Sequence, residues 1–222
     1  MIRGIIFDMD GTMVDNMMVH HRAWQAQLAS LGLDLSLAEV QARIHGVNTE
    51  ILQRLFGDRF DAAERIRIST EKEARYRQLF SQELRLVDGL PELLDELRAA
   101  RIPLAIGTAA PVENVDFVLD RLQLRGYFRS VRHAGHVRRG KPDPEIFQLA
   151  AADLGLATTE CLVFEDSLTG AATARNAGCP AIILTTTHAE PEFAAFSHIQ
   201  RFVADYREVN LGYLREAFGL PN

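Results

Sequence analysis

Cysteine and long apolar runs are scarce in this 222-residue sequence. Its two cysteines, Cys161 and Cys179, lack the close spacing of a metal site, and so few thiols fit a reducing compartment. No apolar run reaches the roughly 20 residues that span a bilayer, and the apolar residues 1–7 are too few for a signal peptide. We therefore expect a cytoplasmic protein without a membrane partner, whose cysteines pack as small hydrophobic residues.

Basic charge is also in short supply. Lysine and arginine number 24 against 30 aspartates and glutamates, a formal net charge of −6. This balance argues against a nucleic-acid partner, because phosphate backbones attract basic patches. A small phosphorylated metabolite stays compatible with it, since a bound cation and a few local donors offset the overall sign. With 47% hydrophobic residues, the chain is typical of a globular protein, which we expect to be a monomer.

Short apolar runs alternate with helical patterns over much of the chain. The runs are continuous rather than alternating, which predicts strands buried on both faces of a parallel sheet. They lie at residues 4–7, 104–107, 130–133, 162–164 and 181–184, with a weaker one at 202–203. Helical periodicity is found at residues 90–99, 112–122, 144–154 and 169–177. Gly155 and Gly178 stand at two expected C-caps. The alternation predicts an α/β fold, a doubly wound parallel sheet with right-handed crossovers.

One long region interrupts this alternation. From about residue 15 to residue 86 only amphipathic helical patterns occur, which is too long for a simple crossover. The predicted helices lie at residues 21–31, 37–45, 49–56 and 62–80. The pattern predicts an inserted all-α cap domain at 16–83, hinged near 15–17 and 82–87. Residues 1–15 and 84–222 would form the catalytic core domain.

The first predicted strand ends in the acidic segment Asp8-Met9-Asp10-Gly11. Residues two apart in an extended chain project to the same side, so Asp8 and Asp10 can face one site while Met9 faces away. Gly11 permits the turn that follows. Because ligands of α/β folds bind at the carboxyl ends of the strands, these two acids are candidate catalytic residues.

A second acidic pair, Glu165-Asp166, follows the predicted strand 162–164 and should reach the same edge of the sheet. Carboxylates gathered there would repel one another and take up protons unless a cation were bound. Mg²⁺ suits such oxygen ligands, completed by water and by substrate phosphate. The sequence therefore predicts a magnesium cofactor.

Phosphate-binding donors occur at the ends of other predicted elements. Thr108 ends the strand 104–107 and offers its hydroxyl, together with the backbone N–H groups of Ala109 and the residue after it. Lys141 offers a point charge just before a helix whose Pro144 suits position N1. Phosphoryl transfer needs little beyond in-line positioning and charge stabilisation, which these groups can supply.

Together these segments resemble the motifs of the haloacid-dehalogenase superfamily, in order and across nearly the whole chain. The matching residues are Asp8-x-Asp10-Gly-Thr12, Thr108, Lys141 and Glu165-Asp166. The insert is similar to the cap of the β-phosphoglucomutase and phosphatase branch. The resemblance implies that Asp8 attacks phosphorus to form an aspartyl-phosphate, and that Asp10 acts as general acid and then as base. It also implies Mg²⁺ ligands: Asp8, the backbone carbonyl of Asp10, Asp166, and Glu165 directly or through water.

Cap residues bear on whether the acceptor is water or a second sugar hydroxyl. Asn16 and His20 lie in a stretch close to that of β-phosphoglucomutases, and Lys72 falls near the position of a cap lysine in those enzymes. Within the charged run that contains it, however, a solvated face is the favoured interpretation for Lys72. Gly46 and Asn114 are further candidate substrate contacts.

Other positions depart from the mutase pattern. Thr49 replaces a phosphate-gripping arginine, and Ala110-Pro111 replaces a Ser-Lys pair. A charge-assisted contact is worth about 1.5–3 kcal/mol, so a bisphosphorylated intermediate would be held weakly. We therefore predict a Mg²⁺-dependent phosphatase acting on a small phosphorylated metabolite, a sugar phosphate for preference. A β-phosphoglucomutase-like mutase remains the alternative, since Arg43, Arg54 or Arg75 could substitute.

Two other classes are less favoured. A signalling receiver module also accepts phosphate on an aspartate, but it is about half this length, has no cap insert, and carries that aspartate on a central strand. A silent, non-enzymatic binding module would need a cause that the sequence does not show. A P-loop kinase is excluded, because the Gly-x-x-x-x-Gly-Lys-Ser/Thr run is missing.

Overall fold

The computed structural model describes residues 1–44 and 46–221. The chain divides into two compact units. Met1–Asp15 and Arg85–Asn222 form one, called here the core unit, and Asn16–Leu84 form the other, the cap unit. His45, the last residue of one predicted cap helix, lies outside the described residues.

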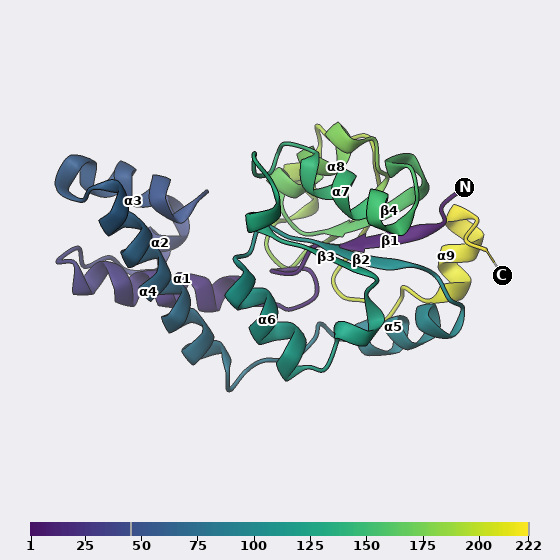
Figure 1. Cartoon of the computed structure of the whole chain (residues 1–222), viewed down its shortest axis with the longest axis horizontal. Coiled ribbons are helices and arrows are strands. Elements are labelled where there is room, and N and C mark those ends of the chain that lie inside the picture. The colour runs from purple at the N-terminus through teal and green to yellow at the C-terminus, as the bar shows by residue number, and fades with distance from the viewer. Residues whose placement is uncertain (45, 222) are drawn as a thin grey trace. The chain divides into compact units, whose positions relative to one another are not determined.

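The core unit is built on a six-stranded parallel sheet with strand order β3-β2-β1-β4-β5-β6 (Figure 1). The strands are β1 Gly4–Phe7, β2 Leu104–Gly107, β3 Ser130–Arg132, β4 Cys161–Glu165, β5 Ala181–Leu184 and β6 Ile199–Val203. Every residue of β1, β2, β4 and β5 is buried, which explains their continuous apolar runs. The predicted fold class is confirmed.

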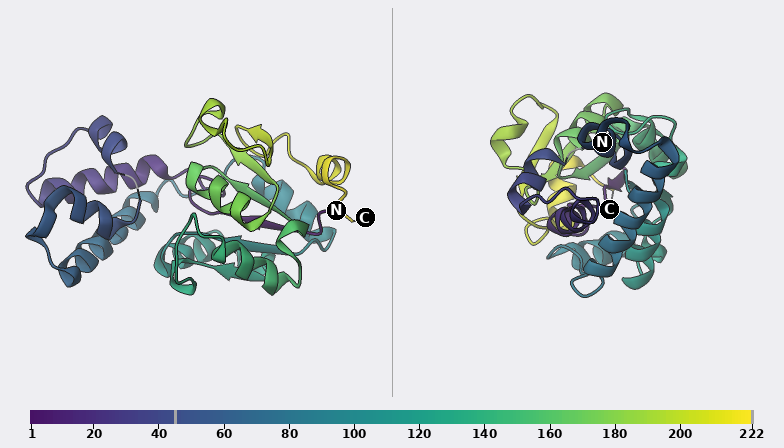
Figure 2. Two further views of the ribbon diagram at one scale, coloured as in Figure 1. Left: turned by 90° about the horizontal axis from the view of Figure 1, so that it is seen from above. Right: turned by 90° about the vertical axis from the view of Figure 1, so that its left-hand side faces the viewer.

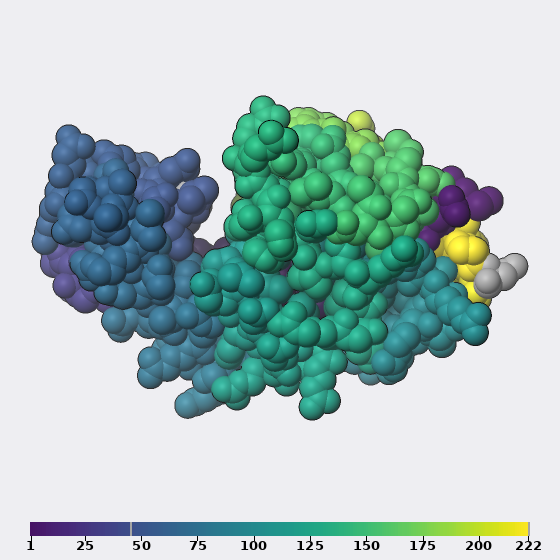
Figure 3. Space-filling view, viewed as in Figure 1, coloured from purple at the N-terminus to yellow at the C-terminus, as the bar shows by residue number. Residues whose placement is uncertain are grey.

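Helices cover both faces of this sheet (Figure 1). They are α5 Leu90–Ala99, α6 Val112–Arg121, α7 Glu145–Leu154, α8 Leu168–Ala177 and α9 Leu211–Phe218. Apolar residues of α7 and α8 share one hydrophobic cluster with inner residues of the strands, so these two helices lie on the same face. In the space-filling view, the teal and green segments that contain α7 and β3 form one continuous surface (Figure 3).

Helix ends agree with the sequence pattern at most positions. Gly155 and Gly178 end α7 and α8 in the left-handed region, with φ of 74° and 77°. Pro144 occupies the N-cap of α7 rather than the predicted N1 position. Helix α9 was not predicted, since Gly212 interrupts its short pattern. The 3-10 turns are η1 Gly57–Arg59, η2 Arg125–Tyr127, η3 Ala134–His136, η4 Thr158–Glu160 and η5 Glu190–Phe193.

The cap unit is helical throughout its described residues, as the sequence pattern predicts (Figure 2). Its helices are α1 Met17–Ser30, α2 Leu37–Arg43, α3 Asn48–Phe56 and α4 Ala62–Phe80. Ser36 and Asp61 begin α2 and α4 with capping boxes, in which each side chain accepts from the N3 backbone. Trp24 and Leu28 of α1 pack with Ile68 of α4 in a separate hydrophobic core.

In the described part of the chain, no helix is long and apolar enough to cross a membrane. The two cysteines are buried free thiols within the core unit. Cys161 begins β4, and Cys179 follows α8 in the same hydrophobic cluster. Their predicted role as small packing residues is confirmed.

Candidate active site

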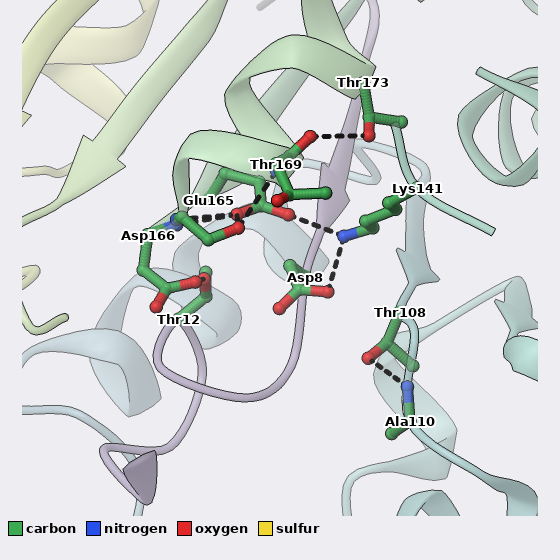
Figure 4. Close-up of polar contacts among 11 residues, drawn as sticks. Asp8, Thr12, Thr108, Ala110, Lys141, Glu165, Asp166, Thr169 and Thr173 are labelled. Carbon is green, nitrogen blue, oxygen red and sulfur yellow. Dashed lines mark hydrogen bonds and ion pairs between the residues drawn. The ribbon is translucent and has the colours of Figure 1, made fainter. Parts of the chain in front are cut away.

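Polar side chains gather where the central strands of the core unit end. Asp8 directly follows β1, Glu165 ends β4, and Thr108 directly follows β2. Because β1 pairs in parallel with both β2 and β4, these chain positions meet at one edge of the sheet. Figure 4 shows Asp8 between Asp166 on one side and Thr108 on the other.

Lys141 joins two of the acids at this edge. Its ammonium Nζ donates to Asp8 Oδ1 at 2.8 Å and to Glu165 Oε1 at 2.5 Å (Figure 4). The lysine side chain is 7% exposed, and Nζ lies 4.8 Å from the ring centroid of Phe147 in α7. The segment before α7 therefore brings Lys141 to the site that its sequence context predicts.

The backbone at the start of α8 sets the orientation of Glu165. Its Oε2 accepts from the N–H groups of Asp166 at 2.9 Å and Ser167 at 3.0 Å, and from the Ser167 hydroxyl at 3.1 Å. Gly170 makes room for this carboxylate, because a Cβ there would lie 1.8 Å from the Glu165 carboxyl carbon. Both oxygens of Glu165 are therefore engaged, one by Lys141 and the other by the helix start.

The turn after β1 is shaped around Asp166. Gly11 has φ of +74°, and a Cβ on it would lie 2.1 Å from Asp166 Oδ2. The Thr12 hydroxyl donates to Asp166 Oδ1 at 3.3 Å. Met9 is fully buried, whereas Asp10 is half-buried in the turn. The predicted turn at Gly11 is confirmed, and the close approach to Asp166 is a second reason for glycine.

Burial and mutual repulsion control the charges of the acids. Burial raises the pKa of Asp8, the Lys141 ammonium lowers it, and the charges of Glu165 and Asp10 raise it again, to about 7. Burial also opposes ionisation of Glu165, but Lys141 and the hydrogen bonds hold its pKa below the usual value. Burial and the charges of Glu165 and Asp8 raise the pKa of Asp166 well above its ordinary value.

These acids fit a divalent cation. Oxygens of Asp8, Glu165 and Asp166 all lie within 4.8 Å of one another, and all three side chains are buried. Lys141 supplies one positive charge against these three carboxyls, so protons or a cation must offset the rest. An all-oxygen donor set is what Mg²⁺ prefers. The backbone carbonyl of Asp10, the fourth expected ligand, remains a prediction.

In the segment after β2, Thr108 and Ala110 are hydrogen-bonded to each other on the side of Asp8 away from Asp166 (Figure 4). The Thr108 N–H donates to the carbonyl of Arg132 at 3.0 Å, and the Thr108 hydroxyl accepts from the N–H of Ala110 at 3.1 Å. Ala109 is exposed at the point of this turn. Asn114, in the first turn of α6, is completely buried, and its contact with substrate remains a prediction.

Within the cap unit, three predicted residues belong to one buried polar cluster. Asn16 Nδ2 donates to the hydroxyl of Tyr76 at 2.6 Å. The ring of His20 stacks on Tyr76, with centroids 3.8 Å apart and planes 6° apart. Lys72 Nζ lies 2.8 Å from His20 Nδ1. An ammonium can only donate, so Nδ1 is the acceptor in this contact.

The favoured interpretation of Lys72 as part of a solvated face was wrong. It is 2% exposed, and its Nζ donates to Glu73 Oε1 at 2.8 Å. The ammonium also lies 5.6 Å from the centroid of Trp24, and Asn48 Nδ2 donates to Glu73 at 2.7 Å. Gly46, with φ of +93°, is exposed in the same unit and makes no part of this cluster.

Sequence reasoning missed several residues of the two clusters. Ser167, Gly170 and Tyr76 give no chemical signal of their own. Glu73 belongs to the charged run Glu71-Lys72-Glu73, but a run of charges does not show which of its side chains face inward.

The model of the haloacid dehalogenase-like hydrolase family matches residues 2–178, which include all four motifs at this edge of the sheet. The chain belongs to this family. It is 34% identical over 181 residues to the fructose-1-phosphate phosphatase YqaB of Escherichia coli K12, covering 81% of this chain and 94% of that protein. It is 30% identical over 193 residues to the β-phosphoglucomutase of Bacillus subtilis 168, covering 82% of each.

A solved haloacid dehalogenase hydrolase, family IA, variant 3, from Entamoeba histolytica HM-1:IMSS has the same fold. Its TM-score is 0.89 at 23% identity, covering 97% of this chain and 99% of that one. At this level of identity the likeness concerns the fold alone. The predicted membership of the superfamily is therefore confirmed, and the site described above belongs to a hydrolase of this family.

Proposed function

We propose that this hydrolase is a Mg²⁺-dependent phosphatase that cleaves a small sugar phosphate through an aspartyl-phosphate on Asp8. The observation that carries the proposal is the buried group in which Lys141 joins Asp8 to Glu165 beside Asp166. The group combines a carboxylate nucleophile with a cation for phosphate and a donor set for a metal. The similarity to a fructose-1-phosphate phosphatase supports a phosphorylated sugar as substrate.

In the first half-reaction, an Asp8 oxygen forms a bond to phosphorus while the ester P–O bond breaks. Asp10 gives its proton to the departing sugar oxygen. Asp10 then takes a proton from water, whose oxygen bonds to phosphorus and releases phosphate from Asp8. Lys141, the Thr108 hydroxyl and the N–H of Ala109 stabilise charge on the phosphoryl oxygens. Bound to Asp8 and Asp166, and to Glu165 directly or through water, Mg²⁺ would neutralise phosphoryl charge and favour the ionised form of Asp8.

The test is a panel of phosphorylated sugars, including fructose 1-phosphate, scored for both phosphate release and isomerisation. Metal-replete enzyme should release phosphate, and chelation by EDTA should stop it. An enzyme that neither hydrolyses an aryl phosphate nor isomerises a sugar phosphate would contradict the proposal.

Replacing the nucleophile gives a sharper test. Asp8→Asn should lower phosphatase activity on the order of 10⁴-fold or more, because an amide cannot form the acyl-phosphate. Circular dichroism should show an unchanged fold, and retained turnover would rule out Asp8 as nucleophile. A matched control is Asp95→Asn, at an exposed acid of α5 that pairs with Arg98, and it should keep full activity.

Mutase activity is the second candidate function, favoured by the similarity to a β-phosphoglucomutase. The cap cluster argues against it. Glu73 and His20 already engage the Lys72 ammonium, and Thr49 offers no positive charge. Hydrolysis is therefore the better proposal. Isomerisation of a sugar phosphate without net phosphate release would instead favour the mutase. We further propose that the enzyme acts as a monomer in the cytoplasm, where its two buried free thiols stay reduced.

A further inference from the structure

The turn that carries Asp10 is held by side chains from the last fifth of the chain. The hydroxyl of Thr186, after β5, donates to the carbonyl of Gly11. The hydroxyl of Tyr206 donates to the next carbonyl, that of Thr12, at 3.3 Å. Both donors lie beyond residues 2–178, the part of the chain that the family model matches.

Tyr206 is firmly placed within the core unit. It is 1% exposed, and its ring centroid lies 5.3 Å from that of Phe164 and 6.3 Å from that of Phe7. Its backbone N–H donates to the carbonyl of Asp88 at 2.9 Å. The chain passes so close to Gly89 that a Cβ there would lie 2.5 Å from the Tyr206 carbonyl carbon. Burial, ring packing and a backbone hydrogen bond thus hold Tyr206 where its hydroxyl reaches the turn.

The rings that Tyr206 packs on belong to β1 and β4, the two strands beside which Asp8 and Glu165 lie. Phe7 immediately precedes Asp8, and Phe164 immediately precedes Glu165. Their rings stack at 5.0 Å and 7°, and Tyr206 packs on both. Packing on Phe7 and Phe164 therefore fixes the Tyr206 hydroxyl relative to β1 and β4, the strands that end beside Asp8 and Glu165.

Two kinds of hydrogen bond hold the turn, some from its own backbone and some from these side chains. Within the turn, the N–H groups of Gly11 and Met13 donate to the carbonyls of Val14 and Met9, both at 2.8 Å. These bonds leave the carbonyls of Gly11 and Thr12 to be held by the side chains of Thr186 and Tyr206. Thr12 connects the two sides of the turn, because its carbonyl accepts from Tyr206 while its hydroxyl donates to Asp166. Asp10 is joined to Thr12 through Gly11. A rotation of the Thr12 peptide would change the direction of the Asp10 carboxyl.

We propose that Tyr206 is a positioning residue for the general acid Asp10. Its hydroxyl holds the Thr12 carbonyl, Thr186 holds the Gly11 carbonyl, and together they keep the turn in the conformation that aims Asp10 at the leaving oxygen. The inference rests on the acid role of Asp10 in the proposed function. A general acid must lie within hydrogen-bond reach of the atom it protonates, so a small displacement slows proton transfer.

The test is the dependence of kcat/KM on leaving-group pKa, measured with a series of aryl and alkyl phosphates. Tyr206→Phe removes one oxygen and keeps the ring packing. We expect a loss of about 10-fold for alkyl phosphates, which need protonation, and of less than about 3-fold for the best aryl leaving groups. The slope should lie between those of wild type and Asp10→Asn. Thr186→Val should change the slope in the same direction.

Tyr213→Phe is the matched control, because Tyr213 lies in α9 of the same C-terminal segment. Its ring lies under the Arg201 guanidinium and meets Phe218 edge to face. It should leave the slope unchanged. A uniform loss across all substrates for Tyr206→Phe and Thr186→Val, or an altered Tm with an unaltered slope, would show a merely structural role and overturn the inference. A wild-type slope in Asp10→Asn would show that Asp10 is not the general acid. That result would overturn the proposed mechanism, and the positioning role of Tyr206 with it.

Discussion

Gly170 illustrates how a residue without functional groups can determine the chemistry of the site. It lies in the first turn of α8, directly beneath the Glu165 carboxylate, which in turn holds Lys141. A side chain at this position must displace that carboxylate. Because Lys141 also contacts Asp8, the displacement would disturb the proposed nucleophile as well.

We expect Gly170→Ala to lower kcat by at least about 10-fold, the scale of a disturbed charge-assisted contact. The fold should survive, because alanine is favoured over glycine by about 1 kcal/mol within a helix. Gly126→Ala is the control, since a Cβ there meets nothing within 4 Å. Kinetics and thermal unfolding measured on both variants check the prediction. Equal activities would mean that Glu165 does not position Lys141.

Lys72 and Glu73 show a limit of pattern reading at the same scale. The helical pattern of α4 was predicted correctly. Lys72 and Glu73 are nevertheless buried, although they belong to a run of charged residues that predicts a solvent-exposed face. Burial of a charge is tolerated when a partner of opposite sign and further hydrogen bonds are present. The partners here come from three helices, since His20 lies in α1, Asn48 in α3 and Glu73 in α4.

At the scale of elements, this cluster ties the cap helices together and makes their stability depend on pH. Burial opposes ionisation of Glu73, but the charge of Lys72 and the hydrogen bonds from Lys72 and Asn48 lower its pKa from 4.5 to about 2. The unfolded chain therefore binds more protons between these values. The stabilisation is complete above pH 4.5 and is lost as the pH falls toward 2.

We expect this carboxylate to contribute about 3 kcal/mol to the free energy of unfolding near neutral pH. Glu73→Gln should remove most of it and flatten the loss of stability below pH 4.5. Glu71→Gln is the matched control, because Glu71 is the neighbouring acid of α4 and its pair with Arg67 is exposed. Urea unfolding at several pH values is the measurement. Parallel pH profiles for the two variants would contradict the assignment.

Among the strands, burial explains which predictions succeeded. The runs at β1, β2 and β5 were predicted with the observed bounds, because both faces of these strands are covered and every residue is apolar or small. β6 is longer than predicted, Ile199–Val203 instead of residues 202–203, since this edge strand is only partly buried. Gln200 and Arg201 therefore interrupt its apolar pattern.

For the whole molecule, the excess of buried negative charge predicts that metal binding stabilises the folded state. A Mg²⁺ concentration 100 times the dissociation constant should add about 2.7 kcal/mol to the free energy of unfolding. Asp166→Asn should abolish the Mg²⁺-dependent rise in Tm, whereas the exposed substitution Asp95→Asn should keep it. Differential scanning calorimetry with and without EDTA makes the comparison. A rise in Tm that persists in Asp166→Asn would place the ion elsewhere.

By itself, the sequence determined the alternation of strands and helices, the helical insert and the residues proposed to carry the chemistry. These features follow from local periodicity and from residue types next to strand ends, which act over a few residues. Only the tertiary structure decided that β1 lies between β2 and β4, that Lys141 joins Asp8 to Glu165, and that Tyr206 reaches Thr12. It also decided that Lys72 is buried. These contacts depend on strand order and on packing between residues far apart in the chain, and no local pattern encodes them.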